Sequence, residues 1–94
     1  MSELVDEEEI ETLLKKIPEW DHEKKSIFKI FEFDEFMEAI DFVNGVAEIV
    51  EEVGHHPDID IRYCNVTLKL TTHEVNGLTD ADFDLARKID TLLD

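Results

Sequence analysis

The apolar residues of this chain change their spacing several times between a helical and an alternating pattern, and this change restricts the possible folds more than any other feature. Helical spacing predicts three helices. The first begins after Asp6, which can cap it, and ends before Pro18. The second runs from Asp34, as its N-cap, to about Val53, and the last begins after Thr79.

Alternating spacing predicts the strands. The segment 26–33 alternates with apolar side chains on both faces. Residues 59–71 contain either two short strands or one long strand that is broken near Cys64 and Asn65. Trp20 begins a shorter strand-like segment, which leads into a turn over residues 21–25. Strands without strand–helix–strand alternation favour an antiparallel sheet. We therefore expect an α+β fold in the order helix, two strands, helix, two strands, helix, with a four-stranded antiparallel sheet and the helices packed on one face.

Length and charge limit the classes of function. With 94 residues, the chain is long enough for one domain, so we expect residues 1–94 to form a single domain. A formal net charge of −16 argues against partners such as nucleic acid or an anionic membrane, because both require basic patches. The sequence lacks the pattern of a signal peptide or of a membrane span, and its single cysteine fits a reducing compartment. We therefore expect a cytoplasmic protein.

Three of the four histidines lie at predicted ends of helices or strands. His55 and His56 follow the second helix, and His73 follows the last strand. Side chains at such ends can be held rigidly while staying accessible, and histidine exchanges protons near neutral pH. The three histidines are therefore candidate general acids and bases. Two alternatives stay open from the residues alone: a polar cap after a helix, and a metal site, although no HxH, HExxH or paired-cysteine spacing is present.

The residues around these histidines resemble the signature of the pterin-4a-carbinolamine dehydratase family. Seven positions match with compatible gaps over 32 residues: Glu51, His55, His56, Pro57, Tyr63, His73 and Asp82. Trp20, the alternating strand 27–33 and the Gly77-Leu78-Thr79 segment also resemble the family, so the resemblance covers about residues 6–92. The chain departs from the family at Gly54, where a polar residue is frequent, and at Ile59, where an aromatic residue is common.

The resemblance implies a reaction that removes water from a 4a-hydroxytetrahydropterin and yields the quinonoid dihydropterin, without a metal or an organic cofactor. It implies that His55 and His73 are the acid and the base and that His56 chiefly binds and orients the substrate. The substrate-binding set that it implies is Glu51, His56, Pro57, Thr72 and Asp82. The departures at Gly54 and Ile59 would then affect substrate affinity more than the reaction itself.

Structural roles stay open for several members of this set. Glu51 can be a solvated residue on a helix face, and Tyr63 can be a packing residue. Asp82 stands three residues after the Thr79 cap, where a carboxylate stabilises a helix N-terminus. An alternative function also stays open, that of a non-catalytic dimerisation or binding module for a protein partner, because some animal members of the family serve a homeodomain transcription factor in this way.

The second helix predicts self-association. Its apolar residues form two stripes, and one sheet face can cover only one of them. A domain of 94 residues also gains from added burial. We therefore expect a homodimer or homotetramer, as the resemblance also implies. The residues expected in a helix–helix contact between subunits are Phe42, Val46, Ile49 and Val53.

Overall fold

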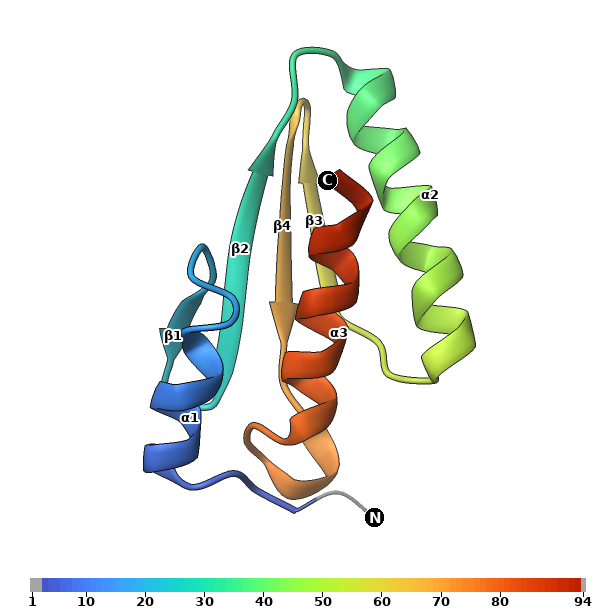
Figure 1. The fold of residues 1–94 in the computed structure, drawn as a ribbon. Helices are drawn as coiled ribbons and strands as arrows, with labels where there is room; N and C mark the ends of the chain where they lie inside the picture. Colours follow the sequence, from blue (N-terminus) through green and yellow to red (C-terminus); the bar gives the residue numbers. More distant parts are fainter. Residues whose placement is uncertain (1–2, 94) are drawn as a thin grey trace.

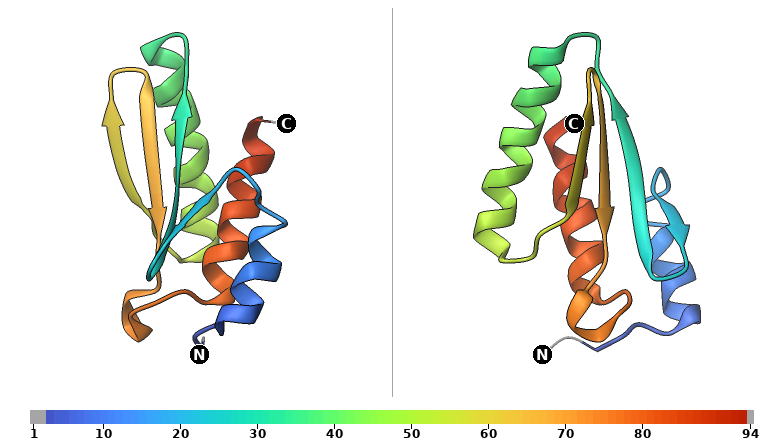
Figure 2. Two further views of the ribbon diagram at one scale, coloured as in Figure 1. Left: turned by 90° about the vertical axis from the view of Figure 1, so that its left-hand side faces the viewer. Right: turned by 180° about the vertical axis from the view of Figure 1, so that it is seen from behind.

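The computed structural model describes residues 3–93 and has the predicted order of elements. The helices are α1 (Glu7–Leu14), α2 (Phe36–Val53) and α3 (Asp80–Asp90), with two short 3-10 helices, η1 (His73–Val75) and η2 (Thr91–Leu93). The strands are β1 (Asp21–Glu23), β2 (Ser26–Glu32), β3 (Asp58–Arg62) and β4 (Asn65–Leu70). They form one antiparallel sheet in the order β1-β2-β4-β3. The helices lie on one side of this sheet (Figures 1 and 2), so the predicted α+β fold is confirmed.

The two central strands supply the sheet side of the core. Ile27 of β2 pairs with Leu70 of β4, and Phe31 pairs with Val66. All four side chains are buried beneath the helices, which contribute the buried residues Phe42, Val46, Phe83, Ala86 and Ile89. The opposite face of the sheet is uncovered within the subunit, and Ile30 on that face is 54% exposed. Strand β2 thus has one apolar face that is buried and one that is exposed within the subunit.

Two helix boundaries differ from the prediction. Helix α1 ends at Leu14, because residues 15–17 bond three positions back and form a tight turn. Ile17 is fully buried although it lies outside the helix. Helix α2 begins after Glu35 and not after Asp34, because the Glu38 side chain accepts a hydrogen bond from the Glu35 amide at 3.1 Å.

Other boundaries depend on left-handed residues. As predicted, α2 ends at Val53, and the residue that follows, Gly54, caps it with a φ of 73°. Residues 21–23, predicted as part of a turn, form strand β1 instead, and the turn is confined to two residues, with Lys24 at a φ of 47°. Tyr63 is not a packing residue of a strand. It lies in the β3–β4 turn with a φ of 55° and is 75% exposed.

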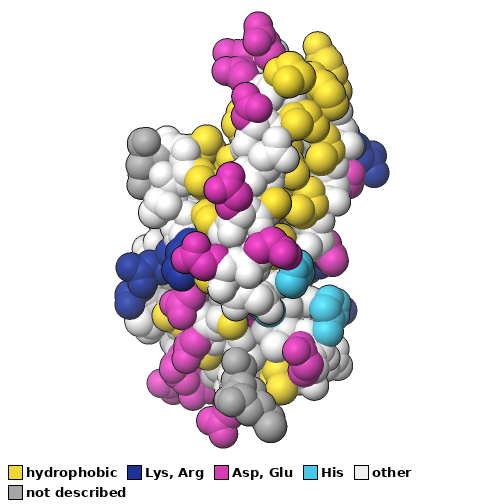
Figure 3. All heavy atoms as spheres, turned by 90° about the vertical axis from the view of Figure 1, so that its right-hand side faces the viewer, with side chains coloured by type: hydrophobic (Ala, Val, Ile, Leu, Met, Phe, Trp, Pro, Cys, Tyr) yellow, Lys and Arg dark blue, Asp and Glu magenta, His cyan; other side chains and the backbone are white. Residues whose placement is uncertain are grey.

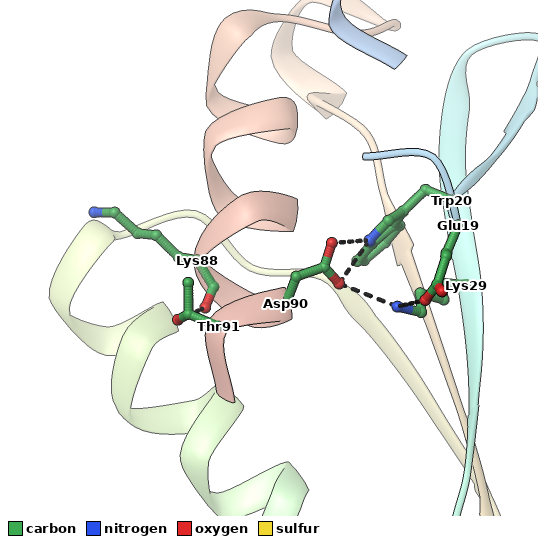
Figure 4. Close-up of polar contacts among 6 residues, drawn as sticks. All are labelled: Glu19, Trp20, Lys29, Lys88, Asp90 and Thr91. Atoms are coloured by element: carbon green, nitrogen blue, oxygen red, sulfur yellow. Dashed lines mark hydrogen bonds and ion pairs between the residues drawn. The ribbon is translucent and has the colours of Figure 1, made fainter. Parts of the chain in front are cut away.

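A polar cluster joins the segment before β1 to the sheet and to the end of α3 (Figure 4). The Trp20 indole N–H donates to both Asp90 carboxylate oxygens at 3.0 and 3.1 Å. Lys29 lies 3.2 Å from Asp90 and 2.9 Å from Glu19. Burial alone would lower the pKa of Lys29, but the hydrogen bonds and charges of the two carboxylates outweigh it and raise that pKa above its ordinary value. The cluster therefore offsets the unfavourable charge of Asp90 at a helix C-terminus.

The predicted helix–helix contact between subunits is wrong for two of its residues. Phe42 and Val46 are 6% and 0% exposed, because they pack on the sheet within the subunit. Exposed apolar side chains lie instead along α2 and the edge strand β3: Phe36, Met37, Val53, Ile59 and Ile61. These five residues are called the apolar band below. Figure 3 shows that hydrophobic side chains gather on the face of the molecule that includes α2.

Within residues 3–93, none of the helices is long and apolar enough to cross a membrane.

Candidate functional site

The sheet topology brings the three predicted histidines to one end of the sheet. Strands β3 and β4 are antiparallel, and Asp58 at the start of β3 pairs with Lys69 near the end of β4. The segment 55–57 enters β3, and the segment 71–73 leaves β4. Both segments therefore meet at the same end, although 18 positions separate His55 from His73 in the sequence. Histidine side chains gather below the hydrophobic surface in Figure 3.

His55 is held by a buried carboxylate. Its Nε2 lies 2.6 Å from Oδ1 of Asp82, in the first turn of α3. The Asp82 side chain is fully buried, whereas the His55 side chain is 19% exposed. A buried carboxylate requires hydrogen-bond partners, and the histidine supplies one of them. The contact therefore fixes the imidazole while one edge of the ring stays accessible.

The other oxygen of Asp82 is held by two threonines. The Thr72 hydroxyl donates to Oδ2 at 2.8 Å, and the Thr79 amide donates to the same oxygen at 3.0 Å. Because Thr72 gives its only hydroxyl proton to Asp82, the Thr79 hydroxyl donates to Thr72 at 2.8 Å. The carboxylate thus accepts hydrogen bonds on both oxygens, and both threonines are themselves buried.

This arrangement selects one protonation pattern for the His55 ring. A carboxylate oxygen accepts a hydrogen bond, so the ring donates to Oδ1 of Asp82 through its Nε2–H. Nδ1 is then the nitrogen that is free to exchange a proton with a bound molecule. The same logic operates wherever a second residue orients a histidine through one nitrogen and leaves the other for chemistry.

His56 is in a different environment. Its Nε2 lies 3.4 Å from the Glu51 carboxylate, and the two side chains are 64% and 80% exposed. An exposed ion pair at this distance contributes little to the stability of the fold, because water screens the charges. Pro57 follows, half-buried, and leads the chain into β3. His56 is therefore accessible but is oriented only weakly within the subunit.

His73 begins the short η1 helix and borders a cavity. It is exposed, and the loop that carries it is closed by paired amides and carbonyls of Thr72 and Gly77. Asn76 takes the left-handed turn conformation with a φ of 57°. The cavity has a volume of about 360 Å³, and Asp58 and Thr71 also line it. This volume lies within the range of small-molecule sites, roughly 300–1,000 Å³.

The structure brings together some of the predicted site residues. Thr72 and Asp82, expected to bind substrate, are buried and bond to each other. Thr79 completes their network, and the sequence showed it only as a helix cap. A signal was present, since Thr79 and Asp82 have capping-box spacing, but nothing local connects that box to His55. Within residues 3–93, no three histidine, cysteine or acidic side chains are grouped to hold a metal ion.

Comparisons with known proteins show that the chain has relatives in one family. The family model described as pterin 4 alpha carbinolamine dehydratase matches residues 3–92. A relative from Acidobacterium capsulatum is 51% identical over 84 residues, which are 89% of this chain and 91% of that protein. A relative from Roseiflexus castenholzii is 46% identical over 93 residues, which are 99% of this chain and 100% of that protein. Both carry the provisional name pterin-4-alpha-carbinolamine dehydratase.

Solved structures share the fold. The crystal structure of a transcriptional coactivator/pterin dehydratase from Brucella melitensis has a TM-score of 0.91 and 29% identity, and the match covers 96% of this chain and 98% of that one. A pterin dehydratase-like protein identified as a RuBisCO assembly factor in the alpha-carboxysome has a TM-score of 0.65 and 26% identity, over 78% of this chain and 84% of that one. The two similarities therefore join one fold to proteins with different described roles.

Proposed function

Because the chain belongs to the pterin 4 alpha carbinolamine dehydratase family, we propose that it removes water from a 4a-hydroxytetrahydropterin. The observation that carries the proposal is the 2.6 Å contact between His55 and the buried Asp82, at the end of the sheet where His73 also lies. The substrate has a hydroxyl on C4a and a hydrogen on N5. The C4a hydroxyl takes up one proton and leaves as water, and N5 loses its proton. The product is the quinonoid dihydropterin.

Two proton transfers accomplish this reaction. A general acid protonates the departing C4a hydroxyl, which leaves as water with the C4a–O bond electrons. A general base takes the proton from N5, whose electron pair forms the new double bond to C4a. We assign these two roles to His55, through Nδ1, and to His73. Positioned groups of this kind contribute about 10² to 10⁴ in rate.

The neighbouring residues have supporting roles in this proposal. Asp82 is a positioning residue, because it is buried and acts through His55. Thr72 and Thr79 hold Asp82 and, in this proposal, act through it. His56, which is exposed and only weakly paired with Glu51, binds and orients the pterin. The reaction needs no metal and no organic cofactor, since both transfers are proton transfers between histidine and substrate.

We also expect the apolar band to be covered by another copy of the chain. Ile59 and Ile61 are 41% and 39% exposed on an edge strand, and Met37 on the adjoining helix is 62% exposed. Apolar surface of this kind marks an interaction site. A homodimer or homotetramer would bury it and would also cover the unpaired edge of β3.

An alternative function uses the same apolar band. A non-catalytic binding module would present Phe36, Met37 and Val53 to a different protein, a role that fits the family's structural relatives with other described activities. The alternative gives no reason for the buried Asp82 network behind His55, because a binding surface does not require an oriented imidazole.

The deciding experiment is kinetic. Purified protein is added to a reaction in which an aromatic amino acid hydroxylase produces the 4a-carbinolamine, and the decay of the carbinolamine is followed by its ultraviolet absorbance. We expect decay to accelerate in proportion to the protein added. Decay at the uncatalysed rate, with a folded protein by circular dichroism, would contradict the proposed activity and favour the binding module.

A further inference from the structure

Positive charge is concentrated around the cavity that His73 borders. The chain has 9 Lys and Arg residues against 25 Asp and Glu residues. Three of those nine, Lys24, Lys25 and Lys69, line this one cavity. The carboxylates that line it are Glu23 and Asp58, so its lining has a net positive charge of one before His73 is counted (three lysines minus two carboxylates). In a chain of net charge −16, this is a local reversal of sign.

Lys24 and Lys25 form the turn of the hairpin made by β1 and β2, and they have no paired carboxylate within the described residues. Glu23 lies 3.7 Å from Lys69 and partly neutralises it. Within the described part of the chain, Lys24 and Lys25 have no carboxylate oxygen within 4.0 Å. Ammonium groups without a partner, beside a cavity, attract anions from solution. The lysines therefore form the part of the lining that is able to bind a negatively charged group.

The backbone of the hairpin is held in place. The Thr71 hydroxyl donates to the Lys25 carbonyl at 2.6 Å, and the His22 ring lies 3.0 Å from the Lys24 carbonyl. The Ser26 hydroxyl donates to the Glu23 carbonyl at 3.2 Å. The first bond ties the turn to Thr71, which directly follows β4 and lies two residues before His73, and the other two bonds lie within residues 22–26. The lysines thus start from fixed positions relative to the proposed catalytic histidine.

The turn also carries a conformational cost. Lys24 has a φ of 47°, in the left-handed region where glycine or asparagine is less strained. Because a lysine is strained at this position, its long cationic side chain is a candidate for a functional role.

We propose that Lys24 and Lys25 bind a phosphate ester on the side chain of the reduced pterin substrate. The inference rests on the proposed function, because it uses the cavity beside His73 as the place where the side chain lies. A phosphate monoester has close to two negative charges and three acceptor oxygens at neutral pH. Two ammonium groups, with the Asn76 side chain in the same lining, match those charges and acceptors. The substrate class is therefore a phosphorylated pterin and not a neutral one.

The test compares two ligands that differ only in the phosphate. One is a 7,8-dihydropterin with a trihydroxypropyl side chain, and the other is the same compound with a phosphate ester on that side chain. Binding of each is measured by calorimetry at low salt, with inorganic phosphate as a third ligand. The variants are the Lys24→Gln, Lys25→Gln double variant and a control with the same change of charge on exposed residues of α3, Arg87→Gln with Lys88→Gln.

We expect the wild type and the α3 control to bind the phosphorylated compound about 10-fold more tightly than the neutral one. We expect the hairpin variant to lose most of this preference, and higher ionic strength to reduce it in the wild type. Equal binding of both pterins by the wild type overturns the inference and leaves the proposed function intact. An unchanged preference in the hairpin variant also overturns it, as does inorganic phosphate that binds as tightly as the phosphorylated pterin. Failure of both pterins to bind contradicts the proposed function itself.

Discussion

Nε2 of His55 lies 2.6 Å from Oδ1 of Asp82, although 27 positions separate the two residues in the sequence. Asp82 also closes the N-terminus of α3, because its Oδ2 accepts the Thr79 amide at 3.0 Å. One carboxylate therefore caps a helix and orients the imidazole that follows another helix. The helix-capping explanation for Asp82 is confirmed, and the proposed mechanism uses the same fixed carboxylate to orient His55.

Asp82→Asn should impair the proposed reaction more than the fold. The amide that replaces one oxygen cannot accept from His55 and from the Thr72 and Thr79 donors at once, so the ring loses its protonation pattern. We expect kcat to fall about 10²-fold with a smaller change in KM. Steady-state kinetics measures both, and Asp84→Asn, exposed on the same helix, is the matched control. An unchanged kcat in the Asp82 variant would show that this carboxylate has no positioning role.

The fold was predictable because its signals are local. The alternation of Ile27 and Phe31 and the left-handed Gly54 depend on neighbours within a few positions, and both have the predicted structure. The errors fall where tertiary contacts decide. Phe42 and Val46 belong to a stripe that the sequence could not assign to the inside or outside of the subunit, and the sheet buries both.

The site was predictable only as a set of residues. The signature spacing selected His55 and Asp82, but only the packing of α3 shows that the two touch and that Thr72 serves the carboxylate. The hairpin lysines gave no sequence signal, because a lysine pair in a turn is usually an exposed pair. Their meaning depends on the pairing of β1, β2 and β4, which brings Lys24 to the cavity beside His73.

Removal of the proposed acid and base should abolish most of the activity. We expect His55→Ala and His73→Ala each to lower turnover by about 10² or more, and His56→Ala chiefly to raise KM. The measurement is the rate of carbinolamine decay at saturating substrate. Glu11→Ala is the control, because Glu11 is an exposed residue of α1. Wild-type turnover in the His55→Ala, His73→Ala double variant would overturn the histidine mechanism.

The activity should survive chelation. The proposed steps move protons between histidines and substrate, so dialysis against a strong chelator should leave kcat unchanged. Elemental analysis of the protein before and after dialysis provides the comparison. Stoichiometric zinc in the active protein, with activity that disappears on its removal and returns on its addition, would replace this mechanism with metal-assisted dehydration.

The mass in solution should exceed that of the single 11.0 kDa chain, because the apolar band needs cover. We expect Ile59→Asp with Ile61→Asp to dissociate the assembly, since each would place a charge in the contact. Light scattering at micromolar concentration and moderate salt measures the mass. Ile30→Asp is the matched control, because Ile30 is 54% exposed on the opposite sheet face. A wild-type mass of one chain would refute self-association. An assembly that persists in the Ile59→Asp, Ile61→Asp variant would show that the contact between subunits does not involve these two residues.

The cluster around Lys29 should make stability fall at high pH. Glu19 and Asp90 raise the pKa of Lys29 in the folded chain, so the favourable contribution is complete below the ordinary lysine pKa of 10.5 and is lost as the pH rises through the folded value. Lys29→Met keeps the apolar stem but leaves Asp90 with Trp20 alone, and we expect about 1–2 kcal/mol less free energy of unfolding near neutral pH. Urea unfolding at neutral and alkaline pH measures the difference, which should shrink as the pH rises.

The control is Lys69→Met. Lys69 has only an exposed 3.7 Å contact to Glu23, so the substitution should lower the free energy of unfolding much less at either pH. A difference between wild type and Lys29→Met that stays constant with pH would show that the stem, and not the charge of Lys29, stabilises the cluster.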